Sequence, residues 1–237
     1  MATFLLIHGG WHGGWCWDKV KPLLEAKGHT VMAPDLPGHG EDKTPLSEIT
    51  MDVYAQATAD FAASASEPVI VVGHSMTGLS NSQAVEIAPD KFKAQVFVSA
   101  FLLSSGQCLL DQAQPDSENL VLRNLTFSED QSTMTFNQDA LKDALYNCCS
   151  DEDIEWAKSR LHAQASAPFA TPVQLSEERW GSVPRYYISC LRDWAITPKS
   201  QKAMYTANPC EKVFEMDTDH SPFMSRPEEL AEHLDSI

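Results

Sequence analysis

Basic residues and long hydrophobic runs are scarce in this sequence. Its 237 residues include 17 lysines and arginines but 33 aspartates and glutamates, which gives a formal net charge of −16. Such a charge repels nucleic acid and anionic membrane surfaces. The apolar run within residues 3–8 is much shorter than the roughly 20 residues that span a bilayer, and no basic segment precedes it. We therefore expect a cytoplasmic protein with no nucleic-acid or membrane partner.

Cysteine pairs at metal-binding or redox spacing are also missing. The six cysteines are scattered and include no Cys-x-x-Cys pair: Cys16, Cys108, Cys148, Cys149, Cys190 and Cys210. This pattern indicates neither a disulfide framework nor a zinc site, and we expect no metal and no cofactor. Ordinary thiols explain the adjacent Cys148 and Cys149 better than redox activity does.

The apolar residues that are present suffice for one sizeable core. They make up 43% of the chain, an ordinary share for a globular protein. A length of 237 residues is normal for a single α/β domain that carries an insertion. The chain has no internal repeat and no linker that would mark a second independent domain.

Short apolar runs alternate with helical patterns along the first hundred residues. We predict strands at 3–8, 29–33, 69–72 and 92–100, and helices at 15–27, 51–64 and 76 to about 89. The alternation resumes with strands at 185–191 and 212–216 and with helices from 198 and at 227–234. This order predicts a parallel sheet covered by helices on both faces.

The segment between these two parts has a different character. From Gly106 to about Val183 the chain is polar and shows no clear buried strand, but helical patterns occur at 139–146 and 151–161. We interpret residues 106–183 as a helical lid inserted into a core made of residues 1–105 and 184–237. The aromatic residues of this lid pack it onto the core or line a pocket: Phe127, Phe136, Trp156, Phe169 and Trp180.

Residues 68–78 combine a strand, an abrupt turn and the start of a helix. The run Val69–Val72 is apolar and β-branched, Gly73 ends it, and Ser75 follows within two residues. From Met76 the pattern is helical. This order is typical of a nucleophile elbow, in which a strained turn presents the serine hydroxyl above the sheet edge.

Thr77 departs from the elbow pattern. It occupies the place of the second glycine in G-x-S-x-G. We expect its β-branched side chain to crowd Gly73, with Gly73 and Gly78 leaving enough room for the turn to form. On this hypothesis Thr77→Gly keeps or raises both stability and turnover.

An acid and a histidine follow the serine in the order that an α/β-hydrolase requires: Ser75, Asp193, His220. Asp193 and His220 each come just after a predicted strand. Open parallel sheets build their sites along the edge where the strands end, so these side chains can converge there. We predict that Ser75 is the nucleophile, that His220 is the base and that Asp193 orients it.

Other acids and histidines are weaker candidates. Asp217 and Asp219 are nearer to His220 in sequence, but residues so close in a turn rarely reach the far nitrogen of the ring. We expect His8 and His12 to be structural or to line the pocket.

A glycine-rich loop, residues 9–14, follows the first predicted strand. It lacks the Lys-Ser/Thr of a phosphate-binding loop and the spacing of a dinucleotide site. Small residues also suit a loop whose backbone approaches a developing oxyanion. We therefore predict that the N–H groups of Gly10 and Met76 form the oxyanion hole.

Taken together, these residues resemble the α/β-hydrolase superfamily, and more narrowly the plant methylesterase and hydroxynitrile lyase family with its bacterial esterase relatives. The resemblance rests on residues 5–17, 22–24, 28–29, 71–76, 99–101, 169, 181–185, 192–198 and 219–220. It implies an α/β-hydrolase fold, a mostly parallel sheet with helices on both faces. It also implies the same triad, Ser75, Asp193 and His220.

The resemblance extends to the residues around the triad. Gly10 and Met76 match the oxyanion donors of the family, and Trp11 and Phe101 match positions near its acyl pocket. The lyases carry a lysine directly after the catalytic histidine, where this chain has Ser221. They also have a threonine in place of Gly9. Both departures favour hydrolysis over cyanohydrin cleavage.

The function that follows is a serine hydrolase that cleaves a small or medium hydrophobic carboxylic ester through an acyl-enzyme. Two alternatives stay open at this point: C–C cleavage of the hydroxynitrile lyase type, and a non-catalytic member of the fold that binds a ligand. A dehalogenase is disfavoured because its nucleophile would be an aspartate. The sequence leaves the oligomeric state open, a homodimer included.

Overall fold

A central parallel sheet organises the structure, a computed structural model that describes all 237 residues. Its six strands lie in the order β2-β1-β3-β4-β8-β9, and each neighbouring pair is parallel. The strands are β1 (Thr3–Ile7), β2 (Thr30–Met32), β3 (Val69–His74), β4 (Phe92–Val98), β8 (Arg185–Cys190) and β9 (Lys212–Met216). The predicted parallel sheet is therefore confirmed.

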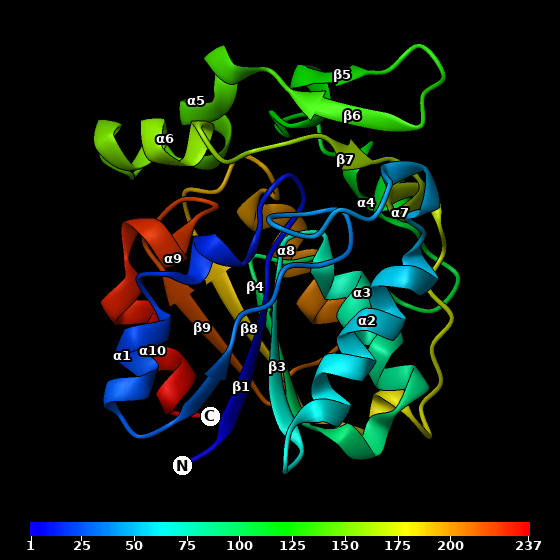
Figure 1. The fold of residues 1–237 in the computed structure, drawn as a ribbon, viewed down its shortest axis with the longest axis vertical. Helices are drawn as coiled ribbons and strands as arrows, with labels where there is room; N and C mark the ends of the chain where they lie inside the picture. Colours follow the sequence, from blue (N-terminus) through cyan, green and yellow to red (C-terminus); the bar gives the residue numbers. More distant parts are fainter.

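Helices cover both faces of this sheet (Figure 1). They are α1 (Lys21–Ala26), α2 (Met51–Ser64), α3 (Thr77–Ile87), α8 (Pro198–Ala207), α9 (Pro222–Ser225) and α10 (Pro227–Asp235). Helix α1 packs with α10 on one face, and α2 packs with α3 on the other. Because both faces are covered, strands β1 and β3 are buried along their whole length, as their continuous apolar runs predict.

One predicted helix is shorter than expected. Residues 15–27 do not form a single helix, because a 3₁₀ turn at Gly14–Trp17 precedes α1. Pro22 lies in the first turn of α1. Proline has no N–H to donate to the carbonyl four residues earlier, so it fits a helix start but not a helix interior.

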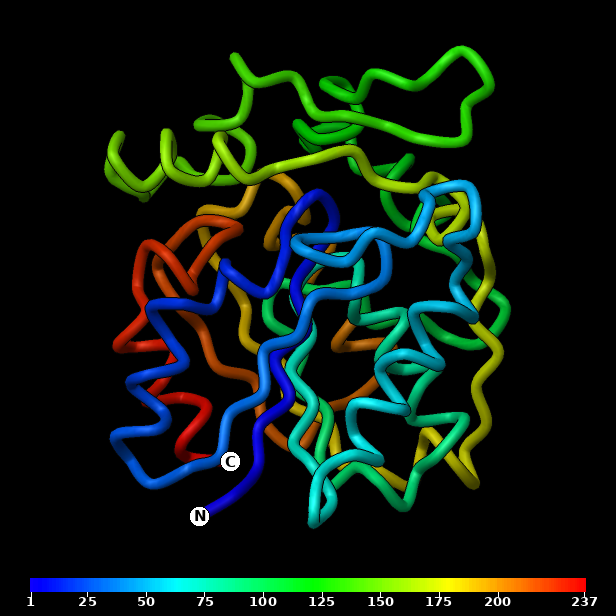
Figure 2. Tube along the Cα trace, in the orientation of Figure 1, coloured from blue at the N-terminus to red at the C-terminus, as the bar shows by residue number.

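Most of the segment between β4 and β8 lies across the carboxyl edge of the sheet, and its last part runs back along the side of the core to the start of β8 (Figure 2). It contains α4 (Leu109–Ala113), α5 (Leu141–Leu145), α6 (Asp151–Lys158), α7 (Ala167–Ala170) and a three-stranded antiparallel sheet of β5 (Leu125–Phe127), β6 (Thr133–Phe136) and β7 (Gln164–Ala165). The helices predicted at 139–146 and 151–161 correspond to α5 and α6. The division of the chain at residues 106 and 183 stays a prediction.

The small sheet of this segment was not predicted. Its strands have two to four residues, and in β6 the buried Met134 and Phe136 alternate with threonines. Two apolar residues are too few to distinguish a strand from a loop by periodicity.

Two further features bear on the expectations from composition. None of the helices has the length and hydrophobicity needed to cross a lipid bilayer. All six cysteines are free thiols, and Cys16, Cys108 and Cys190 are buried.

Gly78, in the first turn of α3, generates a testable prediction about packing. A Cβ at this position would overlap the carbonyl oxygen of Phe101, a backbone atom with little freedom to move. We expect Gly78→Ala to lower the free energy of unfolding by about 1–3 kcal/mol in urea titrations, because overpacking outweighs the gain in helix propensity.

Gly181→Ala is the matched control for this prediction. There the added Cβ meets mainly the carboxylate of Glu177, the mobile end of a side chain. We expect a change within about 0.5 kcal/mol, and equal losses in the two variants would contradict the proposed clash.

Candidate active site

Ser75 lies at the apex of the turn between β3 and α3. Its φ is +57°, a conformation that residues other than glycine rarely adopt. Two hydrogen bonds hold the turn against the chain beyond β3: Ser75 N–H donates to Val98 O (3.4 Å), and Phe101 N–H donates to Ser75 O (3.0 Å). The strained turn that the sequence predicts at this serine is present.

The Thr77 side chain does not crowd Gly73, so that expectation was wrong. Its hydroxyl donates to His74 O (2.9 Å) and lies 3.3 Å from Ile7 O. It therefore links the ends of β3 and β1, two neighbouring strands. Gly73 is instead approached by the main chain of Thr77 and by the Asn81 amide. The threonine side chain stabilises the turn because two carbonyl acceptors surround its hydroxyl.

Asp193 and His220 form a buried hydrogen-bonded pair. His220 Nδ1 lies 2.7 Å from Asp193 Oδ2, and both side chains are buried. The other carboxylate oxygen, Oδ1, accepts from Ala195 N–H (2.7 Å) and Ile196 N–H (2.9 Å). These bonds hold the carboxylate from the side opposite to the one that meets the imidazole, because they use its other oxygen.

Two further donors reach Asp193 Oδ2, and sequence reasoning did not identify them. The Ser99 hydroxyl donates to this oxygen, and Gln201 Nε2 lies 3.2 Å from it. Ser99 directly follows β4 and has a positive φ of 41°. The strand was predicted to continue to residue 100, so the strand-end rule that selects Asp193 and His220 did not reach Ser99. The observed strand β4 ends at Val98, directly before Ser99.

Asp219 holds the backbone around His220. Its carboxylate accepts from Cys148 N–H (2.7 Å), Ser221 N–H (3.1 Å) and the Ser225 hydroxyl (2.9 Å). Burial raises the pKa of Asp219, and these bonds act in the opposite direction. Its role is to support the loop, since it makes no hydrogen bond to the ring of His220.

His74, the residue before Ser75, supports the same loop from the opposite side. Its Nε2–H donates to the backbone carbonyl of His220 (2.7 Å), and the two rings lie 4.6 Å apart. Burial and the neighbouring His220 lower the pKa of His74 well below its usual value. A neutral His74 leaves His220 without a permanent positive charge beside it.

Three buried histidines hold the carbonyl groups of the glycine loop. His8 Nδ1 lies 2.9 Å from Gly9 O, His12 Nδ1 lies 2.7 Å from Gly10 O, and His39 Nδ1 lies 2.8 Å from His12 O. A carbonyl oxygen can only accept, so each Nδ1 carries the proton.

Each of these rings also receives a hydrogen bond at Nε2. The donors are Leu36 N–H (3.0 Å) to His8, the Tyr146 hydroxyl (2.5 Å) to His12 and the Tyr54 hydroxyl (2.9 Å) to His39. All three histidines are therefore neutral in this arrangement. Burial lowers the pKa of His12 to about 3 and that of His39 to about 4, and it lowers the pKa of His8 well below its usual value.

Residues of the lid segment hold the remaining groups of this loop. Trp11 N–H donates to Gln164 Oε1 (3.4 Å), and Trp11 O accepts from His162 N–H (3.2 Å). In contrast, the N–H groups of Gly10 and Met76 donate to no group of the protein. Both stay available for a ligand.

A cavity of about 30 Å³ joins most of the predicted site residues. Its walls include Ser75, Met76 and His220, as well as Trp11 and Phe101. Eleven of the 14 lining residues are hydrophobic, and none is an aspartate, a glutamate, a lysine or an arginine. The structure thus brings together, at one apolar cavity, residues from Trp11 to His220, which lie near opposite ends of the chain.

The sequence matches the alpha/beta hydrolase family over residues 4–233. Methylesterase 7 of Arabidopsis thaliana is 37% identical over 243 residues, which cover 96% of this chain and 92% of that protein. Two chloroplastic relatives from the same plant are 35% and 33% identical, and this chain spans 55% and 54% of their lengths. Because some relatives are chloroplastic, the expected cytoplasmic location stays a prediction.

Solved structures with the same fold also match along the whole chain. Polyneuridine aldehyde esterase is 30% identical, with a TM-score of 0.89 and coverage of 100% of this chain and 98% of that one. Tomato methylketone synthase I, in complex with 2-tridecanone, is 28% identical, with a TM-score of 0.89 and coverage of 99% and 96%.

From the sequence we expected Thr77→Gly to keep or raise stability. The hydrogen bonds of the Thr77 hydroxyl lead to the opposite prediction. Thr77→Val keeps the volume of the side chain but removes the hydroxyl, and Thr77→Gly also frees the backbone. We expect both to lower the free energy of unfolding, Thr77→Val by about 1–2 kcal/mol, as measured by urea titration. Thr77→Ser retains the donor and serves as the control. Unchanged stability of Thr77→Val would show that the hydroxyl contributes nothing.

The neutral histidines predict a dependence of stability on pH. An unfolded histidine gains its proton as the pH falls through about 6.5, whereas the pKa values of folded His12 and His39 are about 3 and 4. Between these values the unfolded state binds more protons, so the free energy of unfolding falls as the pH falls. Each histidine contributes up to about 1.4 kcal/mol per pH unit.

His12→Asn tests this dependence, because asparagine has no proton to gain. Urea titrations at several pH values between 4.5 and 6 give the free energy of unfolding at each pH. We expect this free energy to change less steeply with pH in the variant than in the wild type. Above pH 7.5 the two slopes should agree. If the free energy of unfolding changed with pH in the same way in both proteins over the whole range, His12 would not be held neutral.

Proposed function

The chain belongs to the alpha/beta hydrolase family and is an esterase, and on this basis we propose that it cleaves carboxylic esters through an acyl-enzyme on Ser75. One observation carries the proposal: the hydrogen-bonded pair of Asp193 and His220 adjoins the cavity that Ser75 lines. The substrate is a small or medium hydrophobic ester.

The pair supplies what the serine lacks. A serine hydroxyl is a weak nucleophile until a base removes its proton. In the proposed mechanism Ser75 Oγ bonds to the carbonyl carbon while its proton passes to Nε2 of His220. Asp193, at Nδ1, keeps that nitrogen protonated and so leaves Nε2 free to accept.

The later steps use the same residues. The bond from the carbonyl carbon to the alcohol oxygen breaks as His220 returns the proton to that oxygen. Water then attacks the acyl-enzyme while one of its protons passes to His220. The bond from the carbonyl carbon to Ser75 Oγ breaks as His220 returns that proton to Oγ, which releases the acid. Since five donors fix the carboxylate of Asp193, the imidazole keeps one orientation through both halves of the reaction.

The free N–H groups of Gly10 and Met76 are suited to bind the oxyanion. The peptide between Gly9 and Gly10 is trans, so its N–H points opposite to its carbonyl. His8 holds that carbonyl and thereby fixes the direction of the N–H. Losing one oxyanion donor typically costs about 3 kcal/mol of barrier, which makes this orientation valuable.

The surroundings of the site support hydrolysis over cyanohydrin cleavage. A Cβ on Gly9 would lie 2.6 Å from His74 Nδ1, so the threonine of the lyases has no room here. Ser221, in the place of the lyase lysine, is buried and does not line the cavity. No cationic side chain therefore stands where cyanide would leave.

The cavity and the relatives agree on the kind of ester. The only polar side chains among its walls are those of Ser75, Asn119 and His220, so an uncharged group fits best. The similar proteins named methylesterases cleave esters of the smallest alcohol, and we propose a methyl or similarly small alcohol for this enzyme.

Ser75→Ala tests the mechanism directly. We expect hydrolysis of p-nitrophenyl acetate to fall by a factor of about 10³ or more, because the acyl-enzyme cannot form. The burst of p-nitrophenol and the labelling by a fluorophosphonate probe should both disappear.

Ser64→Ala, on the exposed end of α2, is the control and should keep wild-type activity and labelling. Labelling of the Ser75→Ala protein would place the nucleophile elsewhere. A wild-type protein that neither reacts with the probe nor hydrolyses esters would instead be a binding protein.

A further inference from the structure

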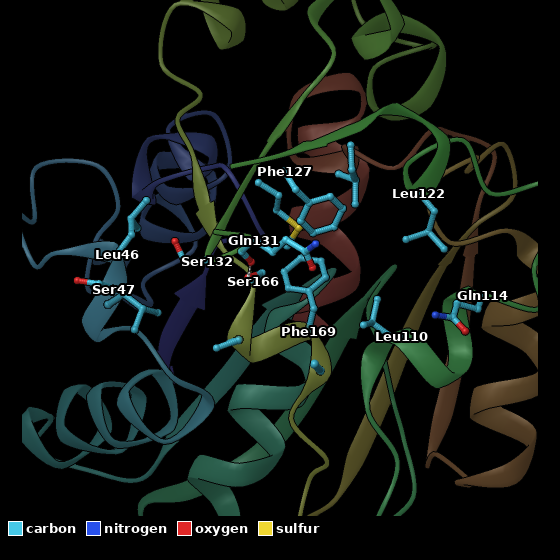
Figure 3. Close-up of a pocket in the computed structure, with 15 residues that line it drawn as sticks. Leu46, Ser47, Leu110, Gln114, Leu122, Phe127, Gln131, Ser132, Ser166 and Phe169 are labelled. Atoms are coloured by element: carbon cyan, nitrogen blue, oxygen red, sulfur yellow. Dashed lines mark hydrogen bonds between the residues drawn. The ribbon is translucent and has the colours of Figure 1, made fainter. Parts of the chain in front are cut away.

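A second, larger cavity lies beside the candidate active site. It measures about 590 Å³ and is lined by 15 residues (Figure 3). Ten of them are hydrophobic, and the polar ones are serines and glutamines. No charged side chain lines it, although the chain carries 17 lysines and arginines and 33 aspartates and glutamates. We call this space the outer cavity and the 30 Å³ space at Ser75 the inner cavity.

The two cavities share two side chains as their common wall. Leu122 and Phe169 line both. Phe169 is buried, and its Cζ lies 3.6 Å from the position that a Cβ of Gly10 would take. The partition therefore stands directly beside the predicted oxyanion donor. Because it includes side chains, rotation about their χ angles can connect the two spaces.

The inner cavity is too small for a whole ester. A water molecule already needs about 10–15 Å³ of such space, and the inner cavity offers about 30 Å³. Any substrate larger than a few atoms must extend beyond it. The outer cavity has the volume of an ordinary ligand pocket, and it adjoins the inner one.

We propose that the outer cavity is the binding site for the acyl chain of the substrate. The inference rests on the proposed function and narrows it to medium-sized esters that join an uncharged, apolar acyl chain to a small alcohol. An apolar chain fits because the walls offer apolar contacts. A charged group would be desolvated there without a partner.

The acyl part is assigned to this cavity for two reasons. His220 must return a proton to the alcohol oxygen, so the alcohol side of the ester faces His220. The partition residue Phe169 instead adjoins Gly10, which receives the carbonyl oxygen. A methyl alcohol also leaves the acid as the only part large enough to reach the outer cavity.

The walls of the outer cavity come from both the core and the lid segment. Leu46 and Ile49 lie in the loop before α2, whereas Leu125 and Phe127 belong to β5. Phe127 is 51% exposed at the rim (Figure 3). Substitutions at Phe127 can therefore alter the cavity without opening the core or touching the inner cavity.

A series of methyl esters from acetate to dodecanoate tests the proposal, because the small alcohol stays constant. In the wild type we expect kcat/KM to rise about two- to fourfold per added methylene until the cavity is filled. The concentrations must stay below those at which the esters form micelles. A flat profile would overturn the proposal.

Two variants locate the effect. Phe127→Glu places a carboxylate at the rim, and Ala170→Trp fills the cavity from an exposed position. We expect kcat/KM for the decanoate to fall at least tenfold, chiefly through KM, while that for the acetate changes less than twofold. Ile87→Glu, at a residue 39% exposed on the far end of α3, is the control and should change neither.

The remaining outcomes each overturn the proposal in a recognisable way. If kcat/KM fell equally for acetate and decanoate in both variants, the substitutions would be disturbing the structure in general and not a site for the acyl chain. A preference that follows the length of the alcohol in alkyl acetates would place the alcohol, not the acid, in the outer cavity. The variants could instead differ from the wild type in oligomeric state by gel filtration, with an unchanged dependence of kcat/KM on acyl length. That result would mean that the outer cavity is covered by a second copy of the chain.

The failure of the proposed function is distinguishable from all of these. It would appear as a wild type that hydrolyses no ester of the series and does not react with a fluorophosphonate. If acetate is hydrolysed and the probe labels Ser75, but chain length has no effect, only the acyl site is excluded.

Discussion

The carboxylate of Asp193 is the point on which the geometry of the site depends. It receives hydrogen bonds from His220, from Ser99 at the end of β4, from Gln201 on α8 and from two N–H groups of its own loop. A buried charge is tolerated only when it is fully bonded. The same bonds that make its burial possible thus join the ends of β4, β8 and β9 and fix the direction of the imidazole.

The sequence was sufficient for the parts of the site that depend on topology. Strands of a parallel sheet end at one edge, so residues that come just after predicted strands can meet. Asp193 and His220 were selected by that rule, and Ser75 by the pattern of strand, turn and helix around it. Ser99 was not selected, because the strand was predicted to run to residue 100, whereas β4 ends at Val98. A serine becomes informative only when its acceptor is known, and Asp193 is 94 residues away.

The parts that could not be predicted depend on partners remote in sequence. His12 receives its hydrogen bond from Tyr146, 134 residues later, and no local pattern marks that pair. Thr77 was misjudged for a related reason: the elbow pattern records that glycine usually fits the turn. It does not record that Ile7 O, on the neighbouring strand, offers a hydroxyl an acceptor. The small sheet escaped prediction because its strands are too short for a periodic signal.

The segment between β4 and β8 takes part in forming the candidate active site as well as covering it. Tyr146, His162 and Gln164 all donate to, or accept from, the loop that carries Gly10, either directly or through His12. Lifting the segment as a unit would break these bonds and leave buried polar groups without partners, which is costly. Rotation of the partition residues Leu122 and Phe169 breaks none of them. Ligand exchange by side-chain motion is therefore compatible with a glycine loop that stays in place, whereas lifting of the whole segment is not.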